Sequence, residues 1–153
     1  MSTFSTIYDN LVTKCQETIG DEYKRLPNPY APADNNGLFL KRAWGILIGP
    51  GNISEIDVSC RKSGYTRILS IVLARQMSAL PHATEKRADI EIDLVDDFQS
   101  LRNALEQDVT LSNSCVKIEY SADSGIEFFN PRENQRYISV SLDLVVIYEE
   151  RLS

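Results

Sequence analysis

The clearest pattern of apolar and polar positions lies near the end of the chain, over residues 137–148. One face of this stretch is apolar at every second residue: Ile138, Val140, Leu142, Leu144, Val146 and Tyr148. Such a long period-two alternation predicts a β-strand that buries this face in the core. The opposite face is polar up to Asp143 and then carries Val145 and Ile147. We therefore expect the second half of the strand to contact another subunit through Val145 and Ile147.

Two other stretches have the spacing of amphipathic helices. Over residues 3–19 the apolar side chains follow i, i+3, i+4 order, and Gly20 is a natural end to the helix. The second helix is predicted over residues 89–105, with a stripe formed by Ile90, Leu94, Phe98, Leu101 and Leu105 and widened by Ile92 and Val95. Residues 88–95 also alternate between apolar and acidic. A strand followed by a shorter helix from about Asp96 is therefore an alternative.

A glycine-rich turn at residues 49–52 is predicted to join two strands. The first strand, residues 38–48, alternates and contains Trp44, and residues 53–58 are expected to return beside it as a hairpin. Trp44 has two interpretations. It is either a core residue or an interface anchor, because tryptophan is enriched among the residues that dominate interfaces.

A central strand is predicted over residues 65–77, after a basic turn at residues 61–64. It is apolar on both faces, as in a strand that is covered on both sides. One face carries Leu69, Ile71 and Leu73, and the other carries Ile68, Val72 and Ala74. Arg67 and Arg75 lie at the two ends of the Leu69 face, and both are candidate interface residues.

A last hairpin is predicted from residues 115–120 and 126–129, joined by a turn at residues 121–125. A polar loop at residues 130–134 then leads into the final strand. The order helix, strands, helix, strands lacks strict β-α-β alternation. It predicts an α+β fold in which two helices pack on one face of a largely antiparallel or mixed sheet. The length of 153 residues predicts a single domain, residues 1–153.

Residues 20–37 are predicted to form a long irregular loop, because Pro27, Pro29 and Pro32 favour extended backbone. Loops of this length in compact domains are usually functional or disordered. Tyr30 lies in its middle and supplies an apolar contact. We expect this loop to reach onto a neighbouring molecule, with Tyr30 as a candidate interface residue.

The net charge of −6 argues against a general nucleic-acid-binding protein. Residues 1–80 carry +2 and residues 81–153 carry −8, which permits head-to-tail contacts between copies. No apolar run approaches the roughly 20 residues of a membrane span, and we expect no secretory signal. The three cysteines, Cys15, Cys60 and Cys115, are expected to be reduced and partly buried thiols.

Catalytic and metal-binding motifs are not recognisable. His82 is the one histidine, and the chain has neither a G-x-S-x-G sequence nor a phosphate-binding loop. The acidic residues between Asp89 and Asp97 are expected to form a solvated helix face rather than a metal site. We therefore expect no enzyme, no metal and no cofactor. An α+β domain that binds a small ligand is the alternative from another class.

The pattern of the whole chain resembles the tail terminator, or tail completion, proteins of long-tailed bacteriophages. The features that carry this resemblance are the chain length, the helix over residues 4–19, the strands around 38–48 and 65–77, the acidic stretch 84–106, and the ending Leu-Val-Val-Ile-Tyr-Glu-Glu over residues 144–150. These are features of pattern, and no functional residue is carried over from the family.

The resemblance implies a structural protein of the phage neck that forms a hexameric ring. Such a ring caps the tail tube, ends its polymerisation and joins the tail to the head. The implied partners are other copies of the chain, the tail tube protein and a head-side connector or stopper. No membrane or specific nucleic acid is implied, although DNA would pass through the lumen. The protein would be made in the host cytoplasm and end in the virion. Another head–tail connector or stopper protein is the alternative in the same class.

Overall fold

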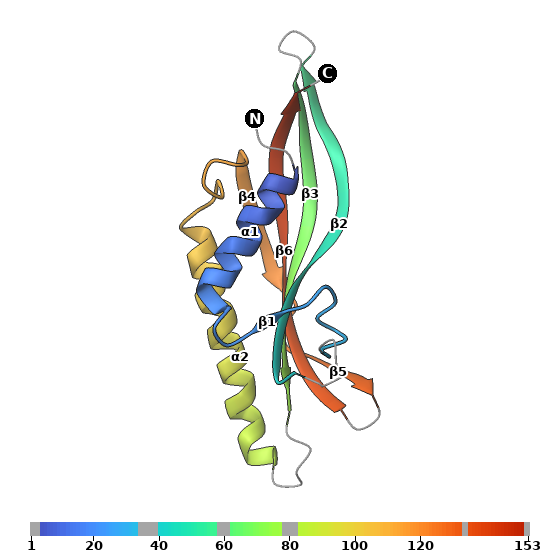
Figure 1. Ribbon diagram of the computed structural model, residues 1–153, viewed down its shortest axis with the longest axis vertical. Coiled ribbons are helices and arrows are strands. Elements are labelled where there is room, and N and C mark those ends of the chain that lie inside the picture. The colour runs from blue at the N-terminus through green and yellow to red at the C-terminus, as the bar shows by residue number, and fades with distance from the viewer. Residues whose placement is uncertain (1–3, 34–39, 58–61, 78–82, 133–134, 152–153) are drawn as a thin grey trace.

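The computed structural model describes residues 4–33, 40–57, 62–77, 83–132 and 135–151. Its elements follow the order α1, β1, β2, β3, α2, β4, β5, β6. The strands belong to one six-stranded mixed sheet, and the two helices lie together over one face of it (Figure 1). The predicted α+β fold is therefore confirmed.

The centre of the sheet is the antiparallel pair of β3 (Lys62–Gln76) and β6 (Gln135–Arg151). Their ladder runs from Lys62 opposite Arg151 to Gln76 opposite Tyr137 without a register shift. The even-numbered side chains of β6 face the helices, and Leu142 and Leu144 are 1% and 0% exposed. The predicted face of β6 is buried. β3 was predicted to be covered on both sides, and this is correct only in part, because Val72 and Ala74 are 0% exposed whereas Ile68 is partly exposed.

The strand β2 (Arg42–Asp57) pairs antiparallel with β3, and the short β1 (Lys24–Arg25) pairs parallel with β2. The turn predicted at residues 49–52 is wrong, because β2 continues through it with a register shift between Ile48 and Gly51. The Arg67 guanidinium donates a hydrogen bond to the Gly49 carbonyl at 3.1 Å. A strand therefore tolerates Pro50 at this bulge on the outer side of the sheet.

The basic turn predicted at residues 61–64 is also corrected in part. Lys62 to Gly64 belong to β3, whereas residues 58–61, which include Arg61 and Cys60, lie outside the described residues. The two strands expected around residues 49–52 are thus one long strand, and its antiparallel partner is β3. His82 also lies outside the described residues.

On the far side of β6 the predicted hairpin does not form. β4 (Lys117–Asp123) and β5 (Glu127–Arg132) both pair antiparallel with β6, one after the other. Ser124 holds the chain at the junction, because its N–H donates to the Ser141 carbonyl at 2.9 Å and its Oγ accepts from the Ser141 N–H at 3.0 Å. Gly125 then takes a φ of +70°, which glycine adopts without steric cost. The turn residues therefore make a bulge rather than a reversal.

The helices are α1 (Phe4–Ile19) and α2 (Ala83–Glu106). The strand alternative for residues 88–95 is wrong, because this segment lies within α2. The predicted stripe of α2 is correct apart from its widening, since Ile92 and Val95 are 57% and 44% exposed. The core between helices and sheet contains Ile7, Leu11, Cys15, Trp44, Leu69, Ile71, Leu73, Leu94, Phe98, Leu101, Leu105, Leu142 and Leu144.

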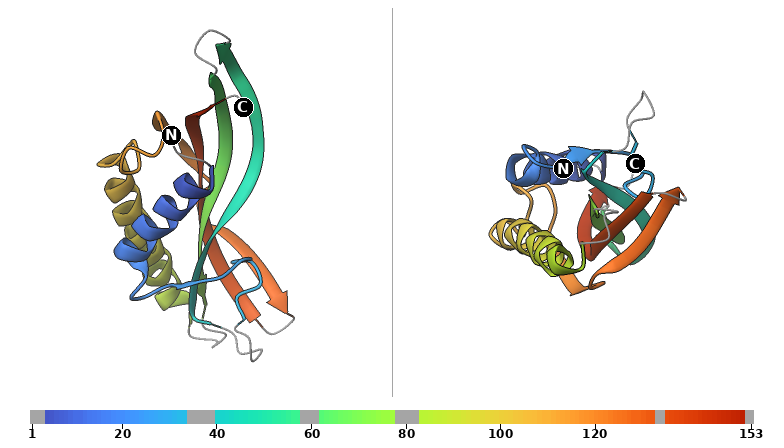
Figure 2. Two further views of the ribbon diagram at one scale, coloured as in Figure 1. Left: turned by 45° about the horizontal axis from the view of Figure 1, so that its top comes forward. Right: turned by 90° about the horizontal axis from the view of Figure 1, so that it is seen from below.

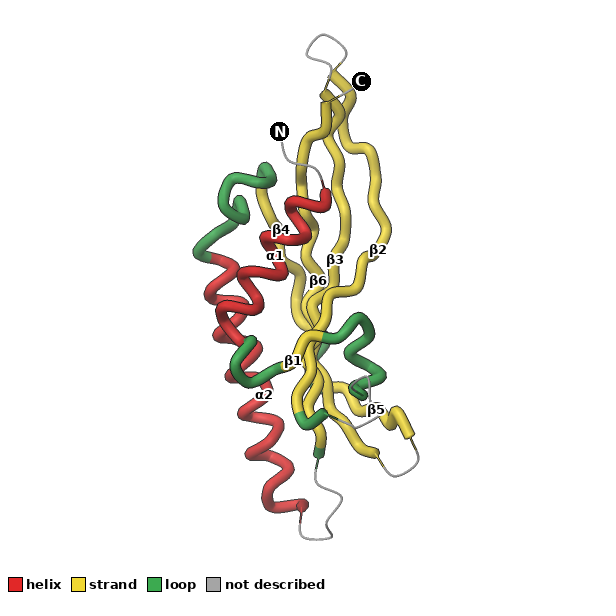
Figure 3. Tube along the Cα trace, in the orientation of Figure 1, coloured by secondary structure: helices red, strands yellow, loops and turns green. Residues whose placement is uncertain are grey.

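Residues 26–33, here called the proline segment, cross to the face of the sheet opposite the helices (Figures 1 and 2). The Leu26 N–H donates to the Trp44 carbonyl at 2.9 Å, and Pro29 is buried. A Cβ on Gly45 would lie 2.5 Å from the Leu26 carbonyl oxygen and 2.8 Å from Cδ of Pro29. Glycine at position 45 is therefore what lets the proline segment lie flat on the sheet. Figure 3 shows this loop in green beside the strands.

The alternation of β6 gives a direct test of its register. In Leu144→Asp, a carboxylate without a partner would replace a side chain that is 0% exposed. Burying such a charge costs several kcal/mol, roughly the stability of a typical domain. We expect this variant to be unfolded by circular dichroism. Val145→Asp, on the opposite face, should fold. Equal urea midpoints for the two variants would contradict the assigned register.

Candidate functional site

The face of the sheet opposite the helices is only partly covered. At one end the proline segment lies over it, but its middle carries the side chains of Leu47, Ile68, Val145 and Ile147, all partly exposed. We call these four residues the open face. Ile68 and Val145 are direct partners in the β3–β6 ladder, and Ile147 follows on the same side of β6. The open face thus brings together Val145 and Ile147, both predicted as interface residues.

Polar side chains border the open face. The Ser70 hydroxyl donates to the Asp143 carboxylate at 2.6 Å, and Lys117 pairs with Glu119 at 3.0 Å. These four side chains therefore pair with one another at the border of the open face. The result is an aliphatic patch with a polar rim, which is the usual anatomy of a contact between proteins.

Towards the Lys62 end of β3, the strands β2, β3 and β6 extend beyond α1 as an arm (Figure 1). A second exposed apolar surface lies below this arm on the helix side of β2, where Ile48 and Ile53 are 57% and 59% exposed. Arg67 lies between this arm and the helix, with its guanidinium carbon 5.6 Å from the centre of the Phe4 ring. Arg67 therefore connects the arm to α1 in addition to its bond to Gly49.

Tyr30 lies against this chain's own sheet. Its ring meets Phe129 edge-on with 5.3 Å between centroids, and Phe129 stacks on Tyr137 at 5.4 Å. Burial raises the pKa of Tyr30, and the nearby Glu127 carboxylate raises it further. Contact of the loop with a neighbouring molecule stays a prediction. Residues 34–37 of that loop lie outside the described residues.

Trp44 is 0% exposed and belongs to the core, in agreement with the first of its two interpretations. Its indole Nε1 is buried, and no hydrogen-bond partner for it occurs in the described part of the chain. Because the side chain of Trp44 is not exposed to solvent, it can influence an interface only by packing against β2 from the core side.

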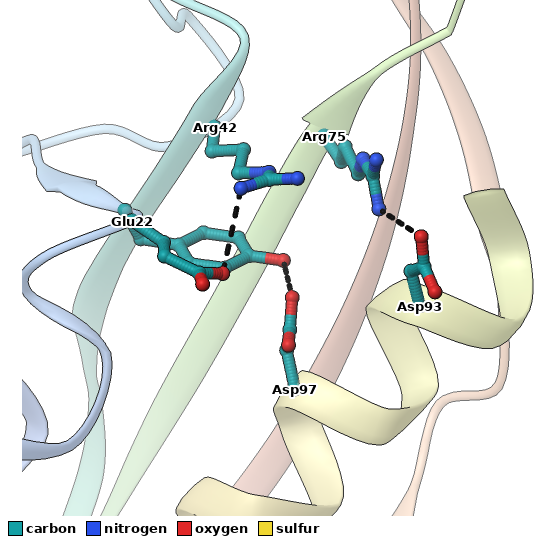
Figure 4. Close-up of polar contacts among 6 residues, drawn as sticks. Glu22, Arg42, Arg75, Asp93 and Asp97 are labelled. Carbon is teal, nitrogen blue, oxygen red and sulfur yellow. Dashed lines mark hydrogen bonds and ion pairs between the residues drawn. The ribbon is translucent and has the colours of Figure 1, made fainter.

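Arg75 lies in a charged cleft beside the ends of α1, β2 and β3. Arg42 is its direct partner in the β2–β3 ladder, so two arginines stand opposite each other on neighbouring strands. Arg42 contacts Glu22 at 3.4 Å and Arg75 contacts Asp93 of α2 at 3.4 Å (Figure 4). The cleft has a volume of about 1300 Å³. These contacts tie the edge of the sheet to both helical regions.

Tyr23 anchors the segment after α1 to α2. It is 1% exposed, and its hydroxyl donates to the Asp97 carboxylate at 2.7 Å. Burial raises the pKa of Tyr23 above 10.0, and the hydrogen bond to Asp97 raises it further. Asp97 therefore belongs to a specific contact rather than to a purely solvated acidic face, and the same holds for Asp93.

Sequence reasoning selected Arg75 but missed Arg42 and Tyr23. A usable signal existed for Arg42, since it lies in the first half of the strand predicted over residues 38–48, while Arg75 lies near the end of the strand predicted over residues 65–77. The register of that pair, which only the structure supplies, brings the two guanidinium groups together. Tyr23 carried no comparable signal within the predicted loop.

The two thiols in the described part of the chain, those of Cys15 and Cys115, contribute little nucleophilic character. Burial raises the pKa of Cys15 to about 12, and burial together with Asp108 raises that of Cys115 to about 11. Both are free cysteines, and at neutral pH both are almost wholly protonated. Within the described ranges, no group of three or more histidine, cysteine and acidic side chains is arranged to hold a metal ion. No helix in the described ranges has the length and apolarity of a membrane span.

No protein-family model matches this chain, and a search among curated proteins finds no match.

The bond between Tyr23 and Asp97 predicts a measurable contribution to stability. Tyr23→Phe should lower the free energy of unfolding by about 1.5–3 kcal/mol, because it removes a hydrogen bond to a charged group. The control is Tyr8→Phe, which removes only an exposed contact with Arg25 and should cost less. Equal losses for the two variants in urea titrations would contradict the anchoring role of Tyr23.

The same bond predicts a pH dependence. The folded-state pKa of Tyr23 is raised above its unfolded value of 10.0, so the unfolded chain loses this proton first. The contribution is therefore complete below pH 10 and is lost as the pH rises beyond it. The stability difference between wild type and Tyr23→Phe should shrink above pH 10.

Proposed function

We propose that this chain is a structural subunit of the neck of a long-tailed bacteriophage, a tail terminator that assembles into a hexameric ring. The ring caps the tail tube, ends its polymerisation and joins the tail to a head-side connector or stopper. Its partners are other copies of the chain, the tube protein and the connector. The order of helices and strands, with a long terminal strand, is the pattern on which this proposal builds.

The observation that carries the proposal is the open face. A sheet with one covered face normally places polar residues on the other. Here Ile68 and Val145 stand opposite each other, and Ile147 lies beside Val145 on the uncovered side. Aliphatic side chains gathered in this way, with polar residues around them, favour a contact with another protein.

The second apolar surface, on β2, supports a contact between copies of the same chain. Its exposed residues Ile48 and Ile53 lie on the helix side, whereas the open face lies on the other side of the sheet. Two different apolar surfaces on opposite sides suit a heterologous, head-to-tail contact. Such a contact produces a closed ring when its rotation divides a full turn.

The test combines light scattering with negative-stain microscopy, with and without tail tubes of the parent phage. We expect rings of the wild-type chain at tube ends. The double variant Val145→Asp, Ile147→Asp should remain a folded monomer, because two carboxylates would be desolvated in the contact. The control places the same two charges on the exposed side of α2, as Ile92→Asp with Val95→Asp, and should assemble as the wild type does.

Two outcomes would contradict the proposal. If the wild-type chain remains monomeric in the presence of tail tubes, the tail terminator function is wrong. If the double variant assembles like the control, the open face is not the contact, even though the chain forms rings.

A further inference from the structure

The charged cleft contains two arginines in an unfavourable arrangement. Arg42 and Arg75 are direct cross-strand partners, and like charges in such positions destabilise a sheet. Both side chains leave the strands on the side of the helices, where they contact Glu22 and Asp93 (Figure 4). The repulsion between the two arginines lowers the stability of the sheet. In a chain with a net charge of −6, we expect the pair to have a function that offsets this loss.

The carboxylates that contact these arginines hold them weakly. Each contact is a single pair of atoms at 3.4 Å, and the side chains of Glu22 and Asp93 are 59% and 61% exposed. Ion pairs with exposed partners contribute about 0–1 kcal/mol. A guanidinium has five N–H donors and binds a carboxylate best through two parallel bonds. Glu22 and Asp93 therefore leave much of the donor capacity unused, and an incoming carboxylate can compete with them.

The surroundings of the two arginines are basic and accessible. Lys24, Arg25 and Lys41 also line the cleft, whose volume is about 1300 Å³. Leu40, Met77 and Ile90 supply apolar walls. Arg75 is the more enclosed of the pair, with a side chain 16% exposed against 34% for Arg42. An anionic group that enters the cleft would thus meet one mostly buried guanidinium and several exposed cations.

The acidic residues of the cleft decide which anion fits. Asp21 and Glu22 line it, and Asp93 and Asp97 border it through their contacts with Arg75 and Tyr23. A phosphate group, with a charge of about −1.5 to −2 at pH 7, would be repelled by all four. A carboxylate carries one charge and can replace Glu22 or Asp93 with little change in the local balance.

We propose that this cleft is a binding site for the carboxylate side chains of an acidic polypeptide segment, held by Arg42 and Arg75 in exchange for their contacts with Glu22 and Asp93. The apolar walls accept the aliphatic parts of the bound side chains. The proposal goes beyond the tail terminator function and does not depend on it, because the site is complete within one chain.

The experiment measures binding of a fluorescently labelled hexaglutamate peptide to the isolated chain by anisotropy at 0.1 M salt. Arg42→Gln and Arg75→Gln should each weaken binding by about tenfold, the effect of losing one charge-assisted interaction. Glu22→Gln with Asp93→Asn should strengthen it, because the internal competitors are gone. The control is Arg102→Gln, which changes the charge equally at an exposed i, i+4 pair with Glu106 and should alter affinity less than about twofold.

Circular dichroism separates binding from folding. Arg42→Gln relieves the repulsion between the arginines and should leave the urea midpoint unchanged or raised. The proposal is overturned if the wild-type chain does not bind the peptide, or if Arg42→Gln and Arg102→Gln weaken binding equally. It is also overturned if inorganic phosphate displaces the peptide as readily as glutarate does, since the site would then not prefer carboxylates.

Discussion

The structure depends on the unbroken pairing of β3 with β6. All 15 residues of β3 have a partner in β6, without a bulge. Because side chains alternate along a strand, a slip of one residue would turn Leu144 outward and Asp143 into the core. The register is thus determined by the core under the helices, and it determines in turn which residues appear on the opposite face. The open face exists because of the same alternation that builds the core.

Irregularity is confined to the strands on either side of this pair. β2 shifts register around Pro50, and the outer strand on the other side breaks between β4 and β5 at Gly125. These strands bend without disturbing the core, and β2, β3 and β6 extend past α1 together as an arm. The regular β3–β6 pair and the irregular strands beside it together give the chain two separate apolar surfaces, the open face and the surface around Ile48 and Ile53. The proposed assembly would use both.

The sequence predicts the elements whose periodicity is set by the core. The first helix, β3 and β6 follow from apolar spacing alone, because tertiary packing and local pattern agree there. The second helix was predicted with a strand alternative over residues 88–95, which the structure excludes. Turns were wrongly predicted at residues 49–52 and 121–125 from their glycine and proline residues. The reason is that the same residue types occur both in turns and in β-bulges. The charged cleft was beyond prediction for a different reason. Tyr23 and Asp97, like Arg42 and Arg75, meet through a register and a helix position that local sequence does not encode.

Hydroxyl-radical footprinting resolved to single residues of β6 tests the central claim most directly, namely that this strand is core on one face and a subunit contact on the other. The account predicts that Leu144 is protected in both the isolated chain and the assembled ring. Val145 and Ile147 should be oxidised in the isolated chain and protected in the ring. Equal oxidation of Val145 and Ile147 in both forms would contradict the account.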